Sequence, residues 1–149
     1  MRFFPESIAA ISKQAMDEYP AECCGIVTGR ADVQHIHPLV NIQERLHAED
    51  PETHPRDSKS AYAVDRNEVE QIIHESARAS EIILAFYHSH IDCDAYFSPM
   101  DKEVQTVFGE PEFPDAVHVV IAVRDGNIHE IKGYLWNGAK QDFVNVEVL

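Results

Sequence analysis

The chain has 149 residues, a length typical of one domain that can bury its own core without disulfides or structural metals. Its 12 basic and 26 acidic residues give a formal net charge of −14. Nucleic acids and anionic membranes bind basic surfaces, so this charge argues against both as main partners. Solubility or adaptation to high salt explains the acidity equally well, and neither explanation indicates a function.

The cysteines and the apolar runs indicate a compartment. Three cysteines, with Cys23 and Cys24 adjacent, do not form a disulfide framework, and an odd number is typical of a reducing environment. The first residues lack the apolar segment of a signal peptide, and the longest apolar run, residues 82–87, is too short to span a bilayer. We expect one soluble, cytoplasmic domain over residues 1–149, and nothing in the sequence indicates an oligomeric state.

In the first half of the chain, hydrophobic periodicity predicts a helix over residues 6–18, ended by Pro20. A short buried strand over residues 24–28 and an alternating strand over residues 33–40 follow. Residues 43–61 are rich in acidic residues and poor in apolar ones. They therefore predict a surface loop.

The sequence of the middle of the chain predicts a helix and the most clearly marked strand. Residues 65–79 regain helical periodicity, with Asp65 at the N-cap position. A strand is predicted over residues 81–90, and its continuously apolar run from Ile82 to Phe86 is expected for a central strand buried on both faces. A loop over residues 91–97 leads to Ser98, where a further helix begins.

The last part of the chain adds one helix and three strands. The helix that begins at Ser98 has a proline at its first position, and its predicted apolar face consists of Val104, Val107 and Phe108. Strands are predicted over residues 116–123, 128–136 and 143–148, with tight turns at Asp125-Gly126 and Asn137-Gly138. This order of elements predicts a single α/β domain.

Three residues near the end of the central strand have metal-ligand chemistry. His88 and His90 are two residues apart, so their side chains point to the same face of the strand. Asp101 lies in the first turn of the next helix, and a strand–loop–helix turn could return its carboxylate to the two imidazoles. Two nitrogens, one carboxylate oxygen and a water form the tetrahedral zinc site with one open position that is typical of catalysis.

A structural explanation of the same residues stays open. The chain has nine histidines, and a lone His-x-His pair is more often not a metal site. Ser98 and Asp101 are also the two ends of a helix capping box. Surface or packing roles are expected for most of the other histidines, which are His35, His37, His47, His54, His74, His118 and His129.

Taken together, the segment His88-Ser89-His90, seven residues, Ser98, two residues and Asp101 resembles the metal motif of the JAMM (MPN+) metalloprotease family. That family also has a glutamate upstream in a segment of the form E-x-C-G, which residues 22–25 match. Asn41 stands where the family often has an asparagine, and the likeness covers about residues 3–136. Ile91 departs from the pattern, because many members have proline there.

The resemblance implies a JAB/MPN fold, an α/β (α+β) domain with a mixed central sheet flanked by helices and a cytidine-deaminase-like architecture. It implies that His88, His90 and Asp101 bind Zn²⁺ with a water as fourth ligand. It implies Glu22 as the general base and acid, and Ser98 as a donor to the substrate oxygen. Without the resemblance, Glu22 reads as a solvated acid after a helix.

The resemblance also implies a substrate. Small stand-alone relatives resemble enzymes that trim the C-terminal tails of ubiquitin-like sulfur-carrier proteins or cleave an adduct after a Gly-Gly tail. We expect residues 43–61 and 91–97 to flank a groove in which such an extended tail pairs with a strand edge.

Three other functions are alternatives to this one. A phage-tail-associated peptidase of the same family ranks lower, because we expect no second domain in these residues. A non-catalytic MPN scaffold ranks lower too, because such members usually lack the metal ligands. A cytidine-deaminase-type zinc hydrolase would need a P-C-x-x-C signature, which is absent.

The cysteines carry no part of this motif chemistry. Cys24 is expected to pack in the core as a small hydrophobe. Cys93 lies in the loop between the candidate ligands, either as an ordinary loop residue or as an oxidation-sensitive gate. The flanking Asp92 and Asp94 should raise the pKa of its thiol, which weakens the second interpretation.

Overall fold

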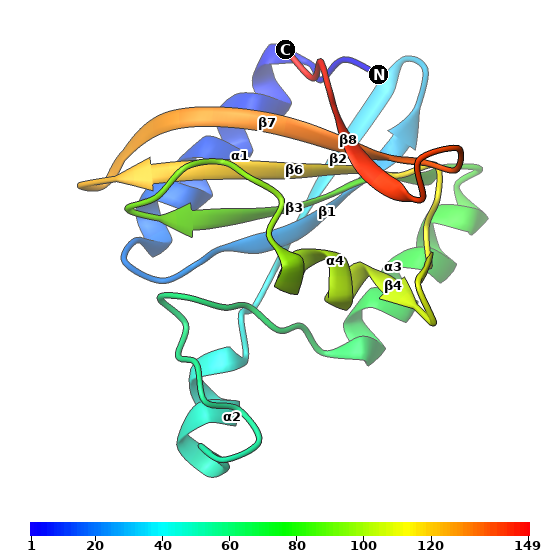
Figure 1. Cartoon of the computed structure of the whole chain (residues 1–149). Coiled ribbons are helices and arrows are strands. Elements are labelled where there is room, and N and C mark those ends of the chain that lie inside the picture. Colours follow the sequence, from blue (N-terminus) through cyan, green and yellow to red (C-terminus); the bar gives the residue numbers. More distant parts are fainter.

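The computed structural model describes residues 1–149, which fold into one mixed α/β domain (Figure 1). A six-stranded sheet in the order β2-β1-β3-β6-β7-β8 forms its centre, and a two-stranded hairpin lies outside it. The elements are α1 (Pro5–Glu18), β1 (Cys24–Arg30), β2 (Val33–Leu39), α2 (Gln43–Glu49), α3 (Arg66–Arg78), β3 (Ile82–Ile91), α4 (Pro99–Gln105), β4 (Thr106–Val107), β5 (Glu110–Pro111), β6 (Val117–Arg124), β7 (Asn127–Asn137) and β8 (Asp142–Val146).

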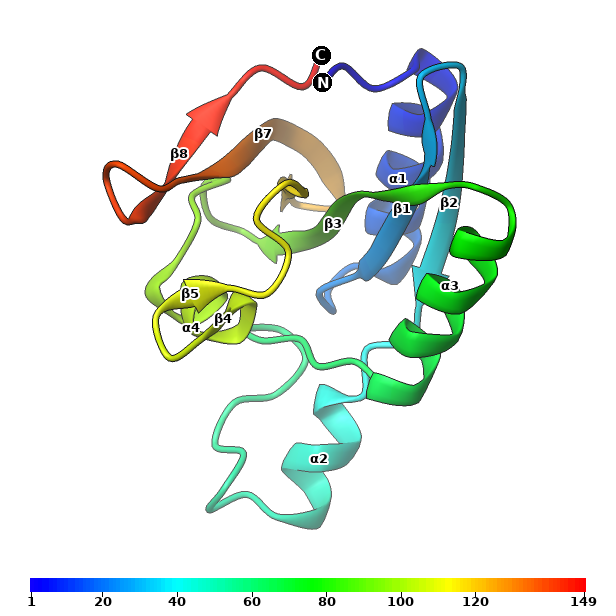
Figure 2. The same cartoon turned by 90° about the vertical axis from the view of Figure 1, so that its right-hand side faces the viewer.

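The sheet is mixed, because its two central strands run parallel while every other pair is antiparallel. In the parallel pair, His88 of β3 lies opposite Val120 of β6. The chain between these strands forms α4 and the β4–β5 hairpin on one face of the sheet (Figures 1 and 2). β6 is buried along almost its whole length, as expected for a parallel strand covered on both faces.

The two faces of the sheet carry different chemistry. One face packs against α1 in the main apolar cluster, which includes Ile11, Tyr87 and Ile121. The other face packs against α3 through Cys24, Ile26 and Val69, with Phe86 alongside. Because side chains alternate along a strand, His88 and His90 share the face of Phe86 and lie away from α1.

The predicted single α/β domain with a mixed sheet flanked by helices is confirmed. The helices predicted over residues 6–18 and 65–79 correspond to α1 and α3, and Asp65 caps α3 by accepting from the N–H of Asn67. Phe3 N–H donates to the carbonyl of Val148 at 3.0 Å, so the two ends of the chain lie side by side (Figure 2). None of the helices combines the length and apolar character needed to cross a membrane.

The prediction of a continuous surface loop over residues 43–61 was wrong, because the first seven of these residues form α2. This helix projects away from the sheet (Figures 1 and 2) and has almost no apolar face to reveal it. It is supported instead by polar contacts with the irregular segment that follows. Nδ1 of His47 lies 2.7 Å from the carbonyl oxygen of His54, and buried Gln43 donates to the carbonyl of Arg56 at 2.7 Å.

The predicted apolar face of the helix after Ser98 was also wrong. α4 ends at Gln105, and the chain then turns into the β4–β5 hairpin. Phe108 and Gly109 both have positive φ at the tip of this hairpin, as a tight primed turn requires. Val104, Val107 and Phe108 are consequently exposed.

The central strand is buried over only part of the length predicted. Ile82 is 63% exposed, whereas residues 87–90 are buried. The reason is register, because pairing with β6 begins only at Ala85. The first residues of β3 therefore have a neighbouring strand on one side only.

Gly25 of β1 allows a close approach between strands. It lies opposite Tyr87 of β3, and a Cβ atom at this position would overlap the tyrosine ring. Tyr87 is buried and donates its hydroxyl hydrogen to Gln14 of α1 at 2.6 Å, so the ring has no room to move.

We expect Gly25→Ala to lower the free energy of unfolding by about 1–3 kcal/mol, the usual cost of overpacking, in urea denaturation. Gly138→Ala, at a turn where the nearest atom lies 4.0 Å away, is the control and should change stability by less than about 0.5 kcal/mol.

His118 of β6 makes stability depend on pH. Its ring is buried among Phe86, Phe97 and Phe143, with ring centroids 5.1–5.7 Å away. Burial lowers the pKa of His118 to about 3, and the nearby His88 adds to this effect. Below the pKa of about 6.5 of a free histidine, the unfolded chain therefore takes up a proton that the folded chain does not. The stability contributed by the neutral ring is complete above that pH and is lost as the pH falls toward 3.

The measurement is urea unfolding of the wild type and of His118→Phe at pH 7.5, 6 and 5. Between pH 7.5 and 5 the wild type should lose about 2 kcal/mol more than the variant, with a slope that approaches about 1.4 kcal/mol per pH unit below pH 6.5. Parallel pH dependences of the two proteins would contradict this role of His118.

Candidate metal centre

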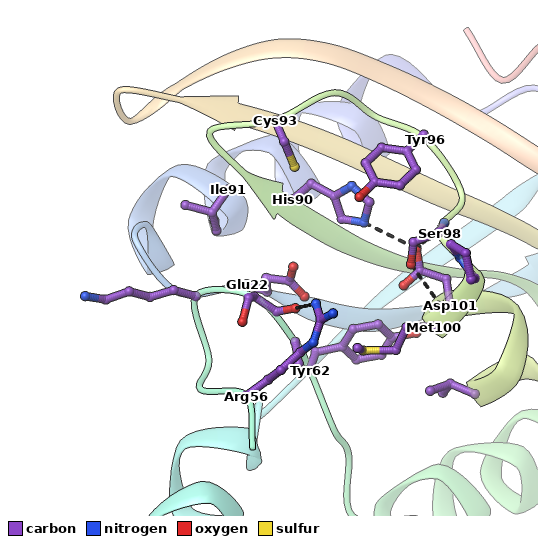
Figure 3. Close-up of a pocket in the computed structure, with 15 residues that line it drawn as sticks. Glu22, Arg56, Tyr62, His90, Ile91, Cys93, Tyr96, Ser98, Met100 and Asp101 are labelled. Carbon is purple, nitrogen blue, oxygen red and sulfur yellow. Dashed lines mark hydrogen bonds and ion pairs between the residues drawn. The ribbon is translucent and has the colours of Figure 1, made fainter. Parts of the chain in front are cut away.

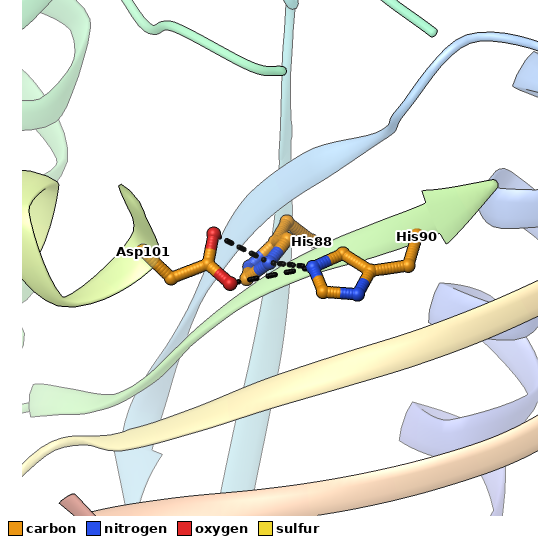
Figure 4. A group of neighbouring side chains, drawn as sticks. All are labelled: His88, His90 and Asp101. Carbon is orange, nitrogen blue, oxygen red and sulfur yellow. Dashed lines mark hydrogen bonds and ion pairs between the residues drawn. The ribbon is translucent and has the colours of Figure 1, made fainter. Parts of the chain in front are cut away.

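The structure brings His88, His90 and Asp101 together, although Asp101 is eleven residues from His90 in the chain (Figure 4). Nε2 of His88 lies 3.2 Å from Oδ1 of Asp101, and Nε2 of His90 lies 3.3 Å from Oδ2. The two Nε2 atoms are 3.2 Å apart, and all three side chains are buried. One ligand atom from each residue lies within 4.8 Å of the others, which is the spacing that a single cation requires.

Asp101 is oriented by the start of α4. Ser98 Oγ accepts from the N–H of Asp101 at 3.1 Å, and the N–H of Ser98 donates to Oδ2 of Asp101 at 2.8 Å. This reciprocal pair is the capping box expected from the sequence, and Pro99 at the first helical position supports it. The cap therefore turns the carboxylate toward the histidines while it begins the helix.

The neighbours of the histidines orient both rings. Nδ1 of His90 lies 3.0 Å from the carbonyl oxygen of Asp94, which can only accept, so Nδ1 carries the proton. In the neutral ring, the lone pair of Nε2 then faces the cluster. The ring of His88 stacks on Tyr62, with centroids 4.6 Å apart, and Gln105 of α4 donates to the hydroxyl of Tyr62 at 3.2 Å.

Charge in the cluster is suited to a cation. Burial alone would raise the pKa of Asp101, but hydrogen bonds with His88 and His90 outweigh it and hold this pKa well below its usual range. Burial lowers the pKa of His88 despite its bond to Asp101. Burial would also lower the pKa of His90, but the hydrogen bonds of His90 to Asp101 and to the Asp94 carbonyl outweigh the effect of burial and raise this pKa. The carboxylate is thus ionised and one imidazole is neutral, the protonation states in which these groups bind metals.

Glu22 lies with His90, Ser98 and Asp101 in the lining of a cavity of about 290 Å³ (Figure 3). Glu22 is only 6% exposed, so the alternative interpretation, a solvated acid after a helix, is wrong. Burial raises the pKa of Glu22 to about 8, with His90 opposing and Asp101 adding to the effect. A carboxyl group with this pKa can carry a proton at neutral pH.

The main chain at Glu22 is held from two directions. Its N–H donates to the carbonyl of Ser58 at 2.7 Å, and its carbonyl accepts from Asn41 Nδ2 at 2.9 Å. One residue on, Ser89 Oγ accepts from the N–H of Cys23 at 2.7 Å, and the N–H of Ser89 donates to the carbonyl of Cys23 at 3.0 Å. Ser89 stands between the two histidines of β3, so these bonds fix Glu22 relative to both.

The lining of the cavity also includes two residues that the sequence analysis did not single out. Arg56 and Tyr62 both come from the region after α2 and line the cavity. The polar composition of that region predicts only a loop, and the region contains no motif that would identify either residue. Tyr62 could have been suspected only as an aromatic residue that follows a polar segment.

Cys93 also lines the cavity, and burial together with nearby acidic residues raises the pKa of its thiol. The thiolate is therefore disfavoured, which agrees with the expectation that the flanking acids weaken a redox role. Cys24 is buried against Ile26 and Val69, as predicted for a core residue.

Comparisons with known proteins identify the family of this chain. The family model for prokaryotic homologs of the JAB domain matches residues 5–133. The CysO-cysteine peptidase of Mycobacterium tuberculosis is 28% identical over 127 residues, which cover 85% of this chain and 76% of that protein. The desampylase of Haloferax volcanii is 30% identical over 92 residues, which cover 60% of this chain and 58% of that protein.

Solved structures share the fold at low identity. A protein from Desulfitobacterium hafniense superposes with a TM-score of 0.70 at 18% identity, covering 97% of this chain and 88% of the other. A JAB1/MPN domain protein from Archaeoglobus fulgidus gives a TM-score of 0.50 at 16% identity, covering 95% and 93%. With the family match over residues 5–133, the chain belongs to the prokaryotic JAB-domain family, and the two relatives above are named a CysO-cysteine peptidase and a desampylase.

Proposed function

We propose that this protein is a zinc-dependent peptidase that hydrolyses a peptide or isopeptide bond at the C-terminal tail of a ubiquitin-like or sulfur-carrier protein. The observation that carries the proposal is the convergence of His88, His90 and Asp101 at a cavity that Glu22 also lines. The names of the two relatives, a CysO-cysteine peptidase and a desampylase, support the substrate class.

The donor set fits zinc. Two imidazole nitrogens and one carboxylate oxygen are typical ligands of a catalytic zinc site, which keeps a further position for water. In its neutral form His90 presents an unprotonated Nε2, because its Nδ1–H is bonded to the Asp94 carbonyl. When bound, zinc lowers the pKa of a coordinated water from 15.7 to about 7 and so supplies a nucleophile at neutral pH.

In this proposal, Glu22 moves the proton. It accepts a proton from the attacking water and passes it to the leaving amine, as general base and then general acid. Its burial and its pKa near 8 support the role, because a group that first takes and then gives up a proton works best with a pKa near the working pH.

Ser98 acts on the substrate carbonyl in this proposal. Its Oγ accepts from the N–H of Asp101, so its hydroxyl hydrogen is left to donate toward the cavity that Ser98 lines. A donor at this position would stabilise the negative charge that develops on the carbonyl oxygen during attack.

The walls of the cavity support an extended substrate. Residues 59–62 contribute to one wall, and residues 90–91, 93, 96 and 98–101 to the other. These segments overlap the regions that the sequence predicts as the sides of a groove for a carrier tail. An extended tail that enters between them would bring its terminal carbonyl to Ser98 and its leaving amine to Glu22.

Glu22→Gln tests the proposed chemistry. Because the amide cannot accept a proton, cleavage should fall by about 10²–10⁴-fold while one zinc per chain is retained. Mass spectrometry of carrier-protein precursors measures cleavage, and elemental analysis measures zinc. Asp101→Asn is the companion variant and should lose zinc and cleavage together. If the zinc-loaded wild type leaves every precursor intact, the non-catalytic scaffold is the better description.

Ser98→Ala and Ser98→Thr separate catalysis from helix capping. Serine and threonine can both cap a helix and donate a hydrogen bond, so the threonine variant should keep most of the activity. The alanine variant should lose about 10²–10³-fold in kcat, as when one donor to the developing oxyanion is removed. It should also lose about 1 kcal/mol of stability with the cap. An alanine variant that is destabilised but turns over normally would show that Ser98 only caps the helix.

A further inference from the structure

Two cations line the cavity of this strongly acidic protein. Arg56 and Lys59 both belong to the segment after α2, and both are exposed at the cavity. Neither forms an ion pair with an acidic side chain. The lysines and arginines that do form such pairs are Arg2, Lys13, Arg30, Arg66, Lys102, Arg124 and Lys132.

The backbone that carries Arg56 is fixed. The buried amide of Gln43 donates to the carbonyl of Arg56 at 2.7 Å. Two residues on, Ser58 accepts from the N–H of Glu22 and donates its own N–H and hydroxyl to Glu44, at 3.0 and 2.7 Å. The segment is therefore tied both to α2 and to the residue proposed as the general base.

The side chain of Arg56 extends from this segment toward Glu22 (Figure 3). The two groups are close enough for the charge of Arg56 to favour the ionised form of Glu22, yet no ion pair joins them. The one hydrogen bond of the guanidinium is a long one of 3.5 Å to the carbonyl of Ser60. Most of the donors of Arg56 are thus available to a ligand beside Glu22.

The position beside Glu22 is where the leaving amine must be protonated. If the leaving group is a single amino acid, its carboxyl carbon is two bonds from that amine, with bonds of about 1.5 Å, so the carboxylate lies within about 4 Å of the amine. If the leaving group is a lysine side chain of a protein, four methylenes separate the amine from the backbone and no carboxylate lies there. A cation beside Glu22 therefore distinguishes the two kinds of bond.

We propose that Arg56, assisted by Lys59, binds the free α-carboxylate of a single amino acid at the C-terminus of the carrier tail. The inference rests on the proposed peptidase function and narrows its substrate to a tail that ends in one additional residue. Water adds its hydroxyl to the terminal carbonyl carbon of the tail, the C–N bond breaks, and the remaining proton goes to the amine. The products are the tail carboxylate and the free amino acid. A guanidinium suits this ligand because it binds a carboxylate through two parallel hydrogen bonds.

The test compares two peptides of one sequence ending in Gly-Gly-Ala, one with a free carboxylate and one with a C-terminal amide. The zinc-loaded wild type should cleave the acid about tenfold better in kcat/KM, the effect of one charged hydrogen-bonded pair. Arg56→Gln should abolish the ratio, and Arg56→Lys should retain part of it through its charge. Arg45→Gln is the matched control, because Arg45 is an exposed arginine of α2 with no ion pair and no place in the cavity. It should keep the full ratio.

Binding to Glu22→Gln with zinc provides a readout that needs no turnover. Fluorescence anisotropy of the two labelled peptides should show that this variant prefers the peptide with the free carboxylate. The double variant that also carries Arg56→Gln should lose this preference. Equal affinities, a preference that survives Arg56→Gln, no binding of either peptide, or better cleavage of a lysine-linked tail would each overturn the inference. If the acid preference in binding is intact but the wild type cleaves no substrate, the carboxylate site stands and the proposed peptidase function fails.

Discussion

The parallel pairing of β3 with β6 is the constraint on which the rest of the site depends. Parallel neighbours cannot be joined by a tight turn, so the chain that leaves β3 just after His90 must cross a face of the sheet before it enters β6. α4 lies in this crossover, and its first turn carries Asp101. The topology thus brings a carboxylate from a helix start onto two imidazoles at a strand end.

The pKa values of the two carboxyl groups at the cavity, Asp101 and Glu22, are shifted in opposite directions by their surroundings. Hydrogen bonds with the histidines and with the N–H of Ser98 hold the pKa of Asp101 low. Glu22 has no comparable donors, so burial dominates and raises its pKa to about 8. A permanently charged carboxylate is suited to holding a cation, whereas one that titrates near neutrality is suited to moving a proton. The division of labour proposed for the two residues follows from what each one touches.

Much of the fold could be predicted from local patterns, because periodicity and capping are local properties. The central strand, the helices over residues 6–18 and 65–79, and the capping box at Ser98 all follow from neighbouring residues. α2 could not be predicted, because polar contacts with the irregular segment that follows support it in place of an apolar face. Phe108 was misassigned because an apolar residue near a helix end looks the same in sequence whether the helix continues or turns.

The candidate site could be predicted only in part for a related reason. His88, His90, Ser98 and Asp101 form a compact motif, and the structure brings them together. Glu22 could be singled out only through resemblance, since its burial depends on segments far away in the chain. Arg56 and Tyr62 belong to no motif, and their place at the cavity depends on how the region after α2 folds back on the sheet.

Ser89 points away from the histidines on either side of it, toward the α1 side of the sheet. Its two hydrogen bonds to Cys23 therefore set the distance between the proposed base and the proposed ligands at a fully buried position. The segments that would contact a substrate tail lie on the opposite side and do not take part in these bonds. Such a division would let these loops change while the spacing of the reactive groups stays constant.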